Sequence, residues 1–143
     1  MMITVETPKH SFFKYRFKNK KFFREFFSPI PCIVNYGFIE GTRGEDGSPI
    51  DVIILGRKLL QGERIDLKIE GVVKFIDDGV RDDKYIAVLD EKRSNWRIIL
   101  FFNFYMIFKK IYFLIKEKRR LECKFEGITW FDEPVESLEK LAV

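Results

Sequence analysis

The sequence from Asn35 to Leu55 is Asn-Tyr-Gly-Phe-Ile-Glu-Gly-Thr-Arg-Gly-Glu-Asp-Gly-Ser-Pro-Ile-Asp-Val-Ile-Ile-Leu. Two apolar, strand-like runs flank a glycine-rich turn that carries carboxylates. Gly47 can adopt a positive φ angle and Pro49 presets φ to about −65°, so this turn is constrained. The second apolar run begins directly at Asp51, which predicts acidic groups held at the rim of a sheet. Oxygens fixed in that way suit a hard cation.

The composition is typical of one folded domain. Of the 143 residues, 46% are hydrophobic and 34% are charged, which excludes a disordered chain, and the length is too short for two ordinary domains. We therefore predict a single domain over residues 1–143. Much of the phenylalanine lies in two clusters, Phe12–Phe27 and Phe101–Phe113, which we expect in the thick parts of the core or at a partner surface.

The charge pattern suits an anionic ligand. The formal net charge is +4, a mild excess that does not require nucleic acid. The segment Met1–Glu25 is basic, whereas the turns near Asp46 and Asp77 are acidic; a solvated basic face with ordinary polar turns is the structural alternative. Cys32 and Cys123 stand apart and there is a single histidine, so neither zinc nor a disulfide framework is favoured. With no visible signal peptide, we expect a cytoplasmic protein.

Alternation and apolar runs predict several strands followed by one long helix. The helix is expected to begin after an N-cap at Ser94 and to end near Lys118, and a short helix is expected over Val135–Leu141. Gly71 predicts a bulge or bend within the longest strand. This order of elements predicts an α+β fold with a small barrel. The expected strands are Met2–Glu6, Phe12–Phe17, Lys21–Phe27, Val52–Leu55, Arg64–Phe75, Tyr85–Leu89 and Leu121–Ile128.

The segment Trp96–Ile115 is apolar on nearly every helical face. Its longest uncharged run, Ile98–Phe108, is shorter than the roughly 20 residues of a membrane-spanning helix. A helix that is apolar all round is either core or covered by a partner, so we expect a homo-oligomer and no membrane partner. A helix lying on a membrane surface is the alternative interpretation.

Two acidic turns each end a predicted strand. Asp46 and Asp51 are five residues apart, as are Asp77 and Asp82. If the turns meet, four carboxylates converge and need bound cations, for which oxygen ligands select Mg²⁺, Mn²⁺ or Ca²⁺. A phosphate bridging two such ions would give a two-metal site for phosphoryl chemistry, although acidic turns are also common in proteins without metals. The basic residues that could hold the phosphate are Lys14, Arg24 and Lys84.

Three blocks of sequence resemble the family I soluble inorganic pyrophosphatases. They are Asn35–Ile39, Glu45–Val52 and Gly71–Lys84, and their order and separation match that family. The resemblance covers roughly Glu6–Val88 well and is weaker beyond. It implies a five-stranded, OB-like β barrel with flanking helices that acts on diphosphate with Mg²⁺, or with Mn²⁺ as the alternative.

The resemblance also implies roles for individual residues. The implied metal ligands are Asp46, Asp51 and Asp82 for the tightest metals, Asp77 for a substrate-borne metal, and Glu6 at the cavity edge. The implied phosphate-binding cations are Lys14, Arg24 and Lys84, and Tyr36 matches a tyrosine near the nucleophile. Surface salt bridges and a core tyrosine are the structural alternatives.

Several positions depart from the family pattern. Ser48 replaces the aspartate thought to accept a proton from the attacking water, and Arg16 replaces a metal-binding glutamate. Cys32 or a neighbour replaces a tyrosine. Of a phosphate-binding Tyr-Lys pair near the helix end, only Lys116 remains. General-base assistance contributes about 10² to 10⁴ in rate, so its loss need not abolish turnover, and Arg16 could bind phosphate in place of a metal.

Three hypotheses follow. The first is an Mg²⁺-dependent inorganic diphosphatase, slow or altered in substrate, with Asp51, Tyr36 and Ser48 at the catalytic centre. The second is a paralogue without catalysis that binds diphosphate or nucleotide phosphates and metal. The third is a single-strand nucleic-acid binder that uses the phenylalanine-rich basic N-terminal segment. We expect diphosphate as the partner and no nucleic acid.

Overall fold

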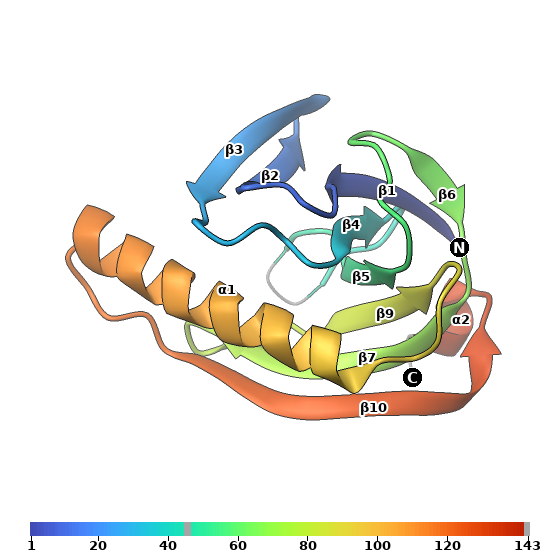
Figure 1. The fold of residues 1–143 in the computed structure, drawn as a ribbon. Coiled ribbons are helices and arrows are strands. Elements are labelled where there is room, and N and C mark those ends of the chain that lie inside the picture. The colour runs from blue at the N-terminus through green and yellow to red at the C-terminus, as the bar shows by residue number, and fades with distance from the viewer. Residues whose placement is uncertain (45–46, 142–143) are drawn as a thin grey trace.

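The computed structural model describes residues 1–44 and 47–141 of the chain. A twisted eight-stranded sheet, a two-stranded hairpin and a long helix make up most of the structure (Figure 1). The elements are β1 (Met2–Thr7), β2 (Phe13–Lys18), β3 (Lys21–Phe27), β4 (Asn35–Ile39), β5 (Asp51–Leu55), β6 (Arg64–Asp66), β7 (Ile69–Asp77), β8 (Val80–Arg81), β9 (Lys84–Val88), α1 (Asn95–Lys116), β10 (Cys123–Val135) and α2 (Leu138–Leu141).

The main sheet has the strand order β10-β7-β9-β5-β4-β1-β6, with β8 paired to β7. Strands β5 and β9 are parallel, and the other pairs are antiparallel. Within the described ranges β10 and β6 do not pair with each other, so the sheet stays open. The α+β class predicted from sequence is confirmed, whereas the five-stranded OB-like barrel is not, because a barrel requires its edge strands to meet.

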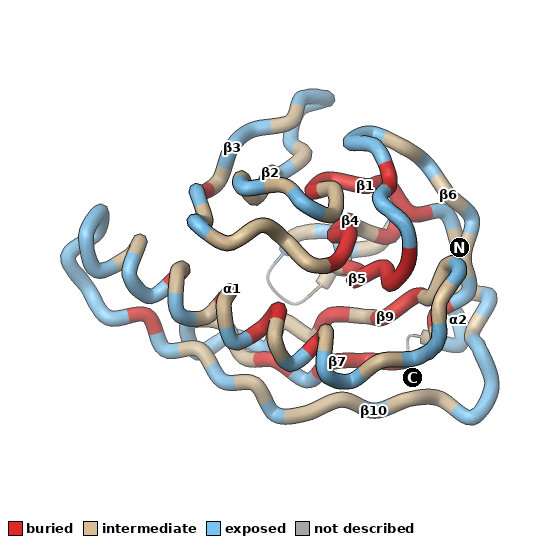
Figure 2. The backbone as a smooth tube through the Cα atoms, in the orientation of Figure 1, coloured by how far each residue is buried: buried red, intermediate tan, exposed pale blue. Residues whose placement is uncertain are grey.

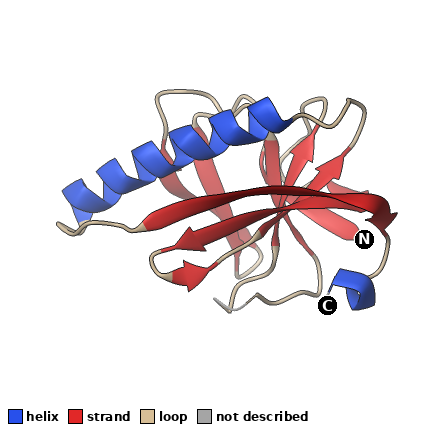
Figure 3. Cartoon of the chain, turned by 90° about the horizontal axis from the view of Figure 1, so that it is seen from below, coloured by secondary structure: helices blue, strands red, loops and turns tan. Residues whose placement is uncertain are grey.

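Both faces of the central strand β5 are buried. Ile53 and Leu55 face a cluster that includes α1, while Val52 and Ile54 face a second cluster on the other side of the sheet. Helix α1 runs along the first face, and the short α2 lies apart from it at the other end of the sheet (Figure 3). Buried residues concentrate in the central strands, as Figure 2 shows. The buried apolar residues of α1 are Ile98, Phe101, Phe102 and Tyr105.

Two glycines permit close backbone approach. A Cβ atom on Gly37 of β4 would lie 2.2 Å from the carbonyl oxygen of Thr4 in β1, so only glycine fits there. A Cβ atom on Gly71 would lie 2.8 Å from the carbonyl oxygen of Thr129, and the register of β7 against β9 shifts between Ile69 and Gly71. The irregularity predicted at Gly71 is therefore confirmed.

Some element boundaries differ from the prediction. The expected strand Arg64–Phe75 is broken at Leu67, because β6 pairs with β1 whereas β7 pairs with β9 and β10. The backbone N–H of Leu67 bonds to the carbonyl oxygen of Met1 at this break. The short helix expected over Val135–Leu141 is present as α2, but it begins at Leu138 because strand β10 continues to Val135. Ser94 is the N-cap of α1, but its hydroxyl makes no capping hydrogen bond.

Candidate functional site

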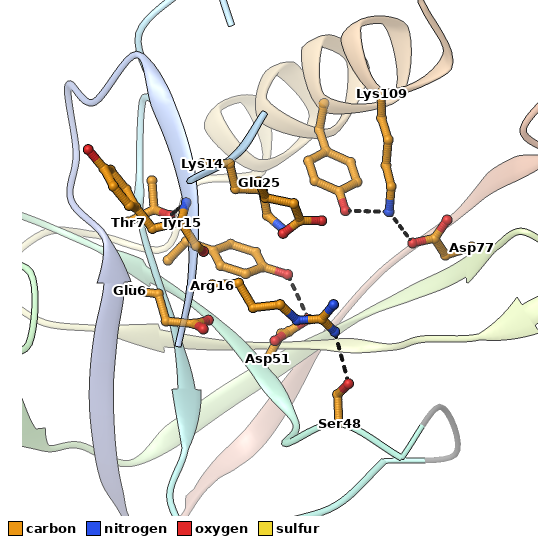
Figure 4. Close-up of polar contacts among 12 residues, drawn as sticks. Glu6, Thr7, Lys14, Tyr15, Arg16, Glu25, Ser48, Asp51, Asp77 and Lys109 are labelled. Atoms are coloured by element: carbon orange, nitrogen blue, oxygen red, sulfur yellow. Dashed lines mark hydrogen bonds and ion pairs between the residues drawn. The ribbon is translucent and has the colours of Figure 1, made fainter. Parts of the chain in front are cut away.

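A charged cavity of about 240 Å³ lies between the β2–β3 hairpin, the ends of the central strands and the inner face of α1 (Figure 4). Opposite charges are almost equal in number on its walls, so ion pairs dominate the electrostatics. The carboxyl groups are Glu6, Glu25, Asp51, Asp77 and Asp82, and the cations are Lys14, Arg16, Lys84 and Lys109.

Sheet register brings the centre of this cavity together. The parallel pairing of β5 with β9 places Val52 opposite Tyr85, so the preceding residues Asp51 and Lys84 lie side by side. The antiparallel pairing of β4 with β5 sets Tyr36 opposite Ile53. Tyr36, Asp51 and Lys84 are distant in sequence and thereby meet at one end of the sheet.

Asp51 lies at the centre of the polar contacts in the cavity. The Nζ atom of Lys84 lies 2.5 Å from Asp51 Oδ2 and 2.6 Å from Asp82 Oδ2, and the Tyr36 hydroxyl donates to Asp51 Oδ2 over 2.8 Å. Burial alone would raise the pKa of Asp51, but Lys84 and Lys14 outweigh it and hold that pKa below its usual value. Burial likewise opposes the charge of Lys84, yet Asp51 keeps its pKa above the usual value. Both groups of this pair are therefore charged.

Lys14 is a second fixed cation. Its Nζ atom lies 3.1 Å from Glu25 Oε2, and it stands 5.1 Å and 5.2 Å from the ring centres of Tyr36 and Tyr105. Burial would raise the pKa of Glu25, but the Lys14 ammonium outweighs burial and lowers it. The aromatic rings and Glu25 together restrict where the ammonium can point.

Lys109 enters the cavity from α1. It forms an ion pair with Asp77 at the end of β7 and donates to the Tyr105 hydroxyl over 3.0 Å. The other Asp77 oxygen accepts a hydrogen bond from the Cys123 thiol, with 3.4 Å between Sγ and Oδ1. Burial and the adjacent Asp77 raise the pKa of Cys123 to about 11, so this thiol stays protonated. Helix α1 thus contributes a cation as well as core packing.

Glu6 differs from the other carboxyl groups. It lies on β1 with 6% of its surface exposed, and its Oε2 atom accepts a hydrogen bond from the backbone N–H of Phe17 at 2.6 Å. Burial raises its pKa to about 7, against the effect of that hydrogen bond. A substantial fraction of Glu6 is therefore protonated at neutral pH.

Arg16 crosses the mouth of the cavity. Its Nη2 atom donates to Ser48 Oγ over 3.0 Å, which links β2 to the turn that precedes β5 (Figure 4). The side chain of Arg16 is exposed, so its guanidinium faces the solvent path into the cavity.

Most of the residues predicted from sequence meet in this cavity. Those that line it are Glu6, Lys14, Arg16, Tyr36, Ser48, Asp51, Asp77, Asp82 and Lys84. Asp46 lies outside the described residues. Because these residues come from the hairpin, the sheet and the loops, their convergence depends on the tertiary fold.

Two predicted phosphate-binding residues, Arg24 and Lys116, do not line this cavity. Alternation along β3 turns Glu25 into the cavity and Arg24 away from it, and the Arg24 guanidinium stacks 4.2 Å from the ring centre of Phe13. Lys116 is the exposed last residue of α1. Lys109, about two turns earlier on the helix, lines the cavity instead.

Lys109, Tyr105 and Glu25 also line the cavity with polar groups and were not predicted from sequence. The spacing of Tyr105 and Lys109 places them one above the other on a helix, and both share the face of the buried Phe101 and Phe102. A lysine on an apolar helical face was the available signal. Glu25 is the carboxylate at the end of a basic hairpin, and its neighbour Phe26 is buried.

The donor chemistry of the cavity suits a hard divalent cation. Among residues 1–44 and 47–141, no three Asp, Glu, His or Cys side chains gather closely enough to hold a metal ion. Asp51 and Asp82 nevertheless each direct one oxygen at a single cation, the Lys84 ammonium. Since Mg²⁺ often binds through one or two carboxylates and completes its shell with waters and phosphate oxygens, this pair fits Mg²⁺.

Known proteins resemble the chain in sequence. The model of the inorganic pyrophosphatase family matches residues 3–112. The inorganic pyrophosphatase of Corynebacterium efficiens is 38% identical over 96 residues, which are 64% of this chain and 61% of that protein. That of Haemophilus influenzae is 44% identical over 61 residues, or 42% of this chain and 35% of that protein. The chain thus matches about three fifths or less of the length of these relatives.

Solved structures resemble the chain over more of its length. The inorganic pyrophosphatase of Helicobacter pylori superposes with a TM-score of 0.76 at 22% identity, covering 98% of this chain and 89% of that one, a likeness of fold alone. The inorganic pyrophosphatase of Neisseria gonorrhoeae gives a TM-score of 0.73 at 26% identity, covering 91% and 82%.

Proposed function

This chain belongs to the inorganic pyrophosphatase family, and from that membership we propose that its cavity hydrolyses inorganic diphosphate to two phosphates with Mg²⁺. The observation that carries the proposal is the cluster of Asp51, Lys84 and Asp82, in which two carboxylates converge on one cation inside a cavity lined by further cations. Such a cavity offers oxygens for a metal and ammonium groups for phosphate.

The cations of the cavity would bind and orient diphosphate. Lys14 and Lys109 are held by Glu25 and Asp77, so their positive charge is already aimed into the cavity before an anion arrives. Arg16 at the mouth can form paired hydrogen bonds to phosphate oxygens. In the reaction a water oxygen bonds to one phosphorus atom and the bridging bond of the diphosphate breaks, which releases two phosphates.

Asp51 and Asp82 would hold the Mg²⁺, or Mn²⁺ as the alternative, with Asp77 close to the substrate. When bound, such a cation withdraws charge from the phosphates and acidifies a coordinated water. The Tyr36 hydroxyl, bonded to Asp51 Oδ2, fixes the orientation of that carboxylate. Lys84 keeps a positive charge beside both carboxylates and limits their mutual repulsion.

Ser48 is the reason to propose a reduced rate. A serine hydroxyl does not accept a proton at neutral pH, and in this cavity it accepts a hydrogen bond from Arg16. The proton of the attacking water then lacks a carboxylate acceptor at position 48. General-base assistance of that kind contributes about 10² to 10⁴ in rate.

The pair of Ser48 and Arg16 also favours a second candidate function. A paralogue without catalysis would bind diphosphate or nucleotide phosphates together with metal, and the guanidinium at the mouth serves binding whether or not hydrolysis follows. Calorimetry distinguishes the two: metal-dependent binding of diphosphate without any phosphate release over hours would establish the binder.

The test of the first proposal is phosphate release from diphosphate in the presence of Mg²⁺. We expect Asp51→Asn to lower the rate by about 100-fold or more, because the variant keeps the shape of the side chain but loses its charge. Asp132→Asn on the exposed part of β10 is the matched control and should behave as the wild type. Equal rates for wild type and Asp51→Asn would show that the site is assigned wrongly.

A further inference from the structure

Lys109 and Asp77 form an ion pair on the side of the cavity that faces α1. Lys109 is buried and extends from the inner face of α1, while Asp77 is the last residue of β7 (Figure 4). The pairing of β10 with β7 places Cys123 opposite Asp77. Both oxygens of Asp77 therefore accept hydrogen bonds: Oδ2 accepts from Lys109 Nζ, and Oδ1 accepts from the Cys123 thiol over 3.4 Å.

Asp77 differs in this respect from the other aspartates of the cavity. Asp51 and Asp82 share one ammonium group, that of Lys84, so two carboxylates converge on a single point. A divalent cation can bridge such a pair. In the part of the chain that the structure describes, Asp77 shares Lys109 with no other carboxylate. It therefore offers a single carboxylate whose charge is already matched.

A metal ion at Asp77 would also lie beside a fixed positive charge. It would have to bind an oxygen that already accepts a hydrogen bond, and it would be close to the Lys109 ammonium group, where like charges repel. Moving Lys109 aside would break its hydrogen bond to the Tyr105 hydroxyl, which is 3.0 Å long. The residues around Asp77 thus do not fit a metal ion, although the resemblance to the family implies one there.

We propose that Lys109 takes the place of a metal ion between Asp77 and the bound substrate. An ammonium group has three N–H donors, and Asp77 and Tyr105 accept two of those of Lys109. The third donates to a phosphate oxygen of diphosphate, so this side of the cavity supplies positive charge without Mg²⁺. The inference rests on the proposed function and defines its metal requirement: Mg²⁺ binds at Asp51 and Asp82 and not at Asp77.

The test counts the Mg²⁺ ions bound per chain by equilibrium dialysis with saturating methylenediphosphonate, a non-hydrolysable diphosphate analogue. We expect Lys109→Met to bind one ion more than the wild type, because it leaves the Asp77 carboxylate unmatched beside phosphate oxygens, a combination that suits Mg²⁺. Lys109→Arg keeps the charge and should bind as many ions as the wild type. Lys58→Met, at an exposed position on the loop between β5 and β6, is the matched control and should also equal the wild type. Thermal unfolding checks that each variant is folded.

Asp77→Asn tests the same assignment from the carboxylate and decides it even if Lys109→Met fails to fold. Because Asp77 holds no metal under the proposal, Asp77→Asn should bind as many ions as the wild type. Added to Lys109→Met, it should remove the ion that Lys109→Met gained.

Two results would overturn the role of Lys109 alone: loss of one ion in Asp77→Asn, or equal counts in the wild type and a folded Lys109→Met. A different result would overturn the proposed function and this inference with it, namely a wild type that binds no methylenediphosphonate at any Mg²⁺ concentration and releases no phosphate from diphosphate.

Discussion

Ser48 lies in the turn before β5, within reach of the Arg16 guanidinium at the mouth of the cavity. Asp51, Asp77 and Asp82 in the cavity are paired with lysines, and the pKa of Asp51 is held below its usual value, so Asp51 is a weak proton acceptor. Glu6, whose pKa is raised to about 7, lies on β1 in the same cavity, and a carboxylate at position 48 would add a proton acceptor near the mouth. Serine does not accept the proton of the attacking water, so under the proposed function we expect the identity of position 48 to decide between an efficient hydrolase and a binder.

The substitution Ser48→Asp should raise the rate of phosphate release. A carboxylate at this position can accept the proton of the attacking water, which is worth about 10² in rate at the lower limit of general-base effects. The assay is phosphate release from diphosphate with Mg²⁺. Ser48→Asn is the matched control, because it adds similar bulk without a proton acceptor. Equal rates in the two variants would refute the role assigned to position 48.

One carboxylate reinforces the backbone pairing of edge strand β6 with β1. Glu40, which follows β4, accepts hydrogen bonds from Arg64 of β6 at 2.6 Å and 2.7 Å and from the Thr4 hydroxyl of β1 at 2.7 Å. The Arg64 bonds, helped by Thr4, lower the pKa of Glu40 to about 2. Because this folded pKa is below the unfolded one, the contact stabilises the fold above the unfolded pKa and is lost as pH falls toward 2.

The variant Glu40→Gln should therefore reduce the free energy of unfolding near neutral pH and have a smaller effect in acid. Arg64 is largely exposed, so the expected loss is below about 1 kcal/mol. Urea unfolding at about pH 7 and about pH 3 measures it. Glu139→Gln, an exposed site on α2, is the control and should change neither value. A loss of the same size at both pH values would contradict the assignment.

Helix α1 shows why an element can be predicted while its role is not. Its length and apolar character followed from sequence, and the interface interpretation rested on the lack of a polar face. In the structure the two faces have different tasks, since Tyr105 and Lys109 complete the cavity whereas Ile107 and Ile111 face outward. Helical spacing assigns residues to faces, but only the packed sheet determines which face is inside.

Across the whole molecule, local patterns predicted the strands and the residues at their ends. Asp51, Asp77 and Asp82 could be proposed because turns and strand starts can be recognised from a few neighbouring residues. Glu25 and Lys109 were missed, although a lysine on an apolar helical face was a signal for Lys109, because their place in the cavity depends on the hairpin and helix closing over the sheet. The sequence also did not predict that the sheet stays open, since pairing of edge strands depends on residues far apart in the chain.

Ligand binding in the cavity should also change the stability of the whole chain. A ligand that binds only the folded state stabilises it by about 2.7 kcal/mol at a concentration 100 times its Kd. Mg²⁺ with a non-hydrolysable diphosphate analogue should therefore raise the thermal midpoint, because the carboxylates of Asp51 and Asp82 converge only in the fold. Chelation of the metal should reverse the rise. The rise in thermal midpoint should be mostly lost in Asp51→Asn and unchanged in Asp132→Asn. Thermal unfolding followed by circular dichroism measures it. An equal rise in all three chains would mean that the ligand acts outside this cavity, since only there does the charge of Asp51 contribute to binding.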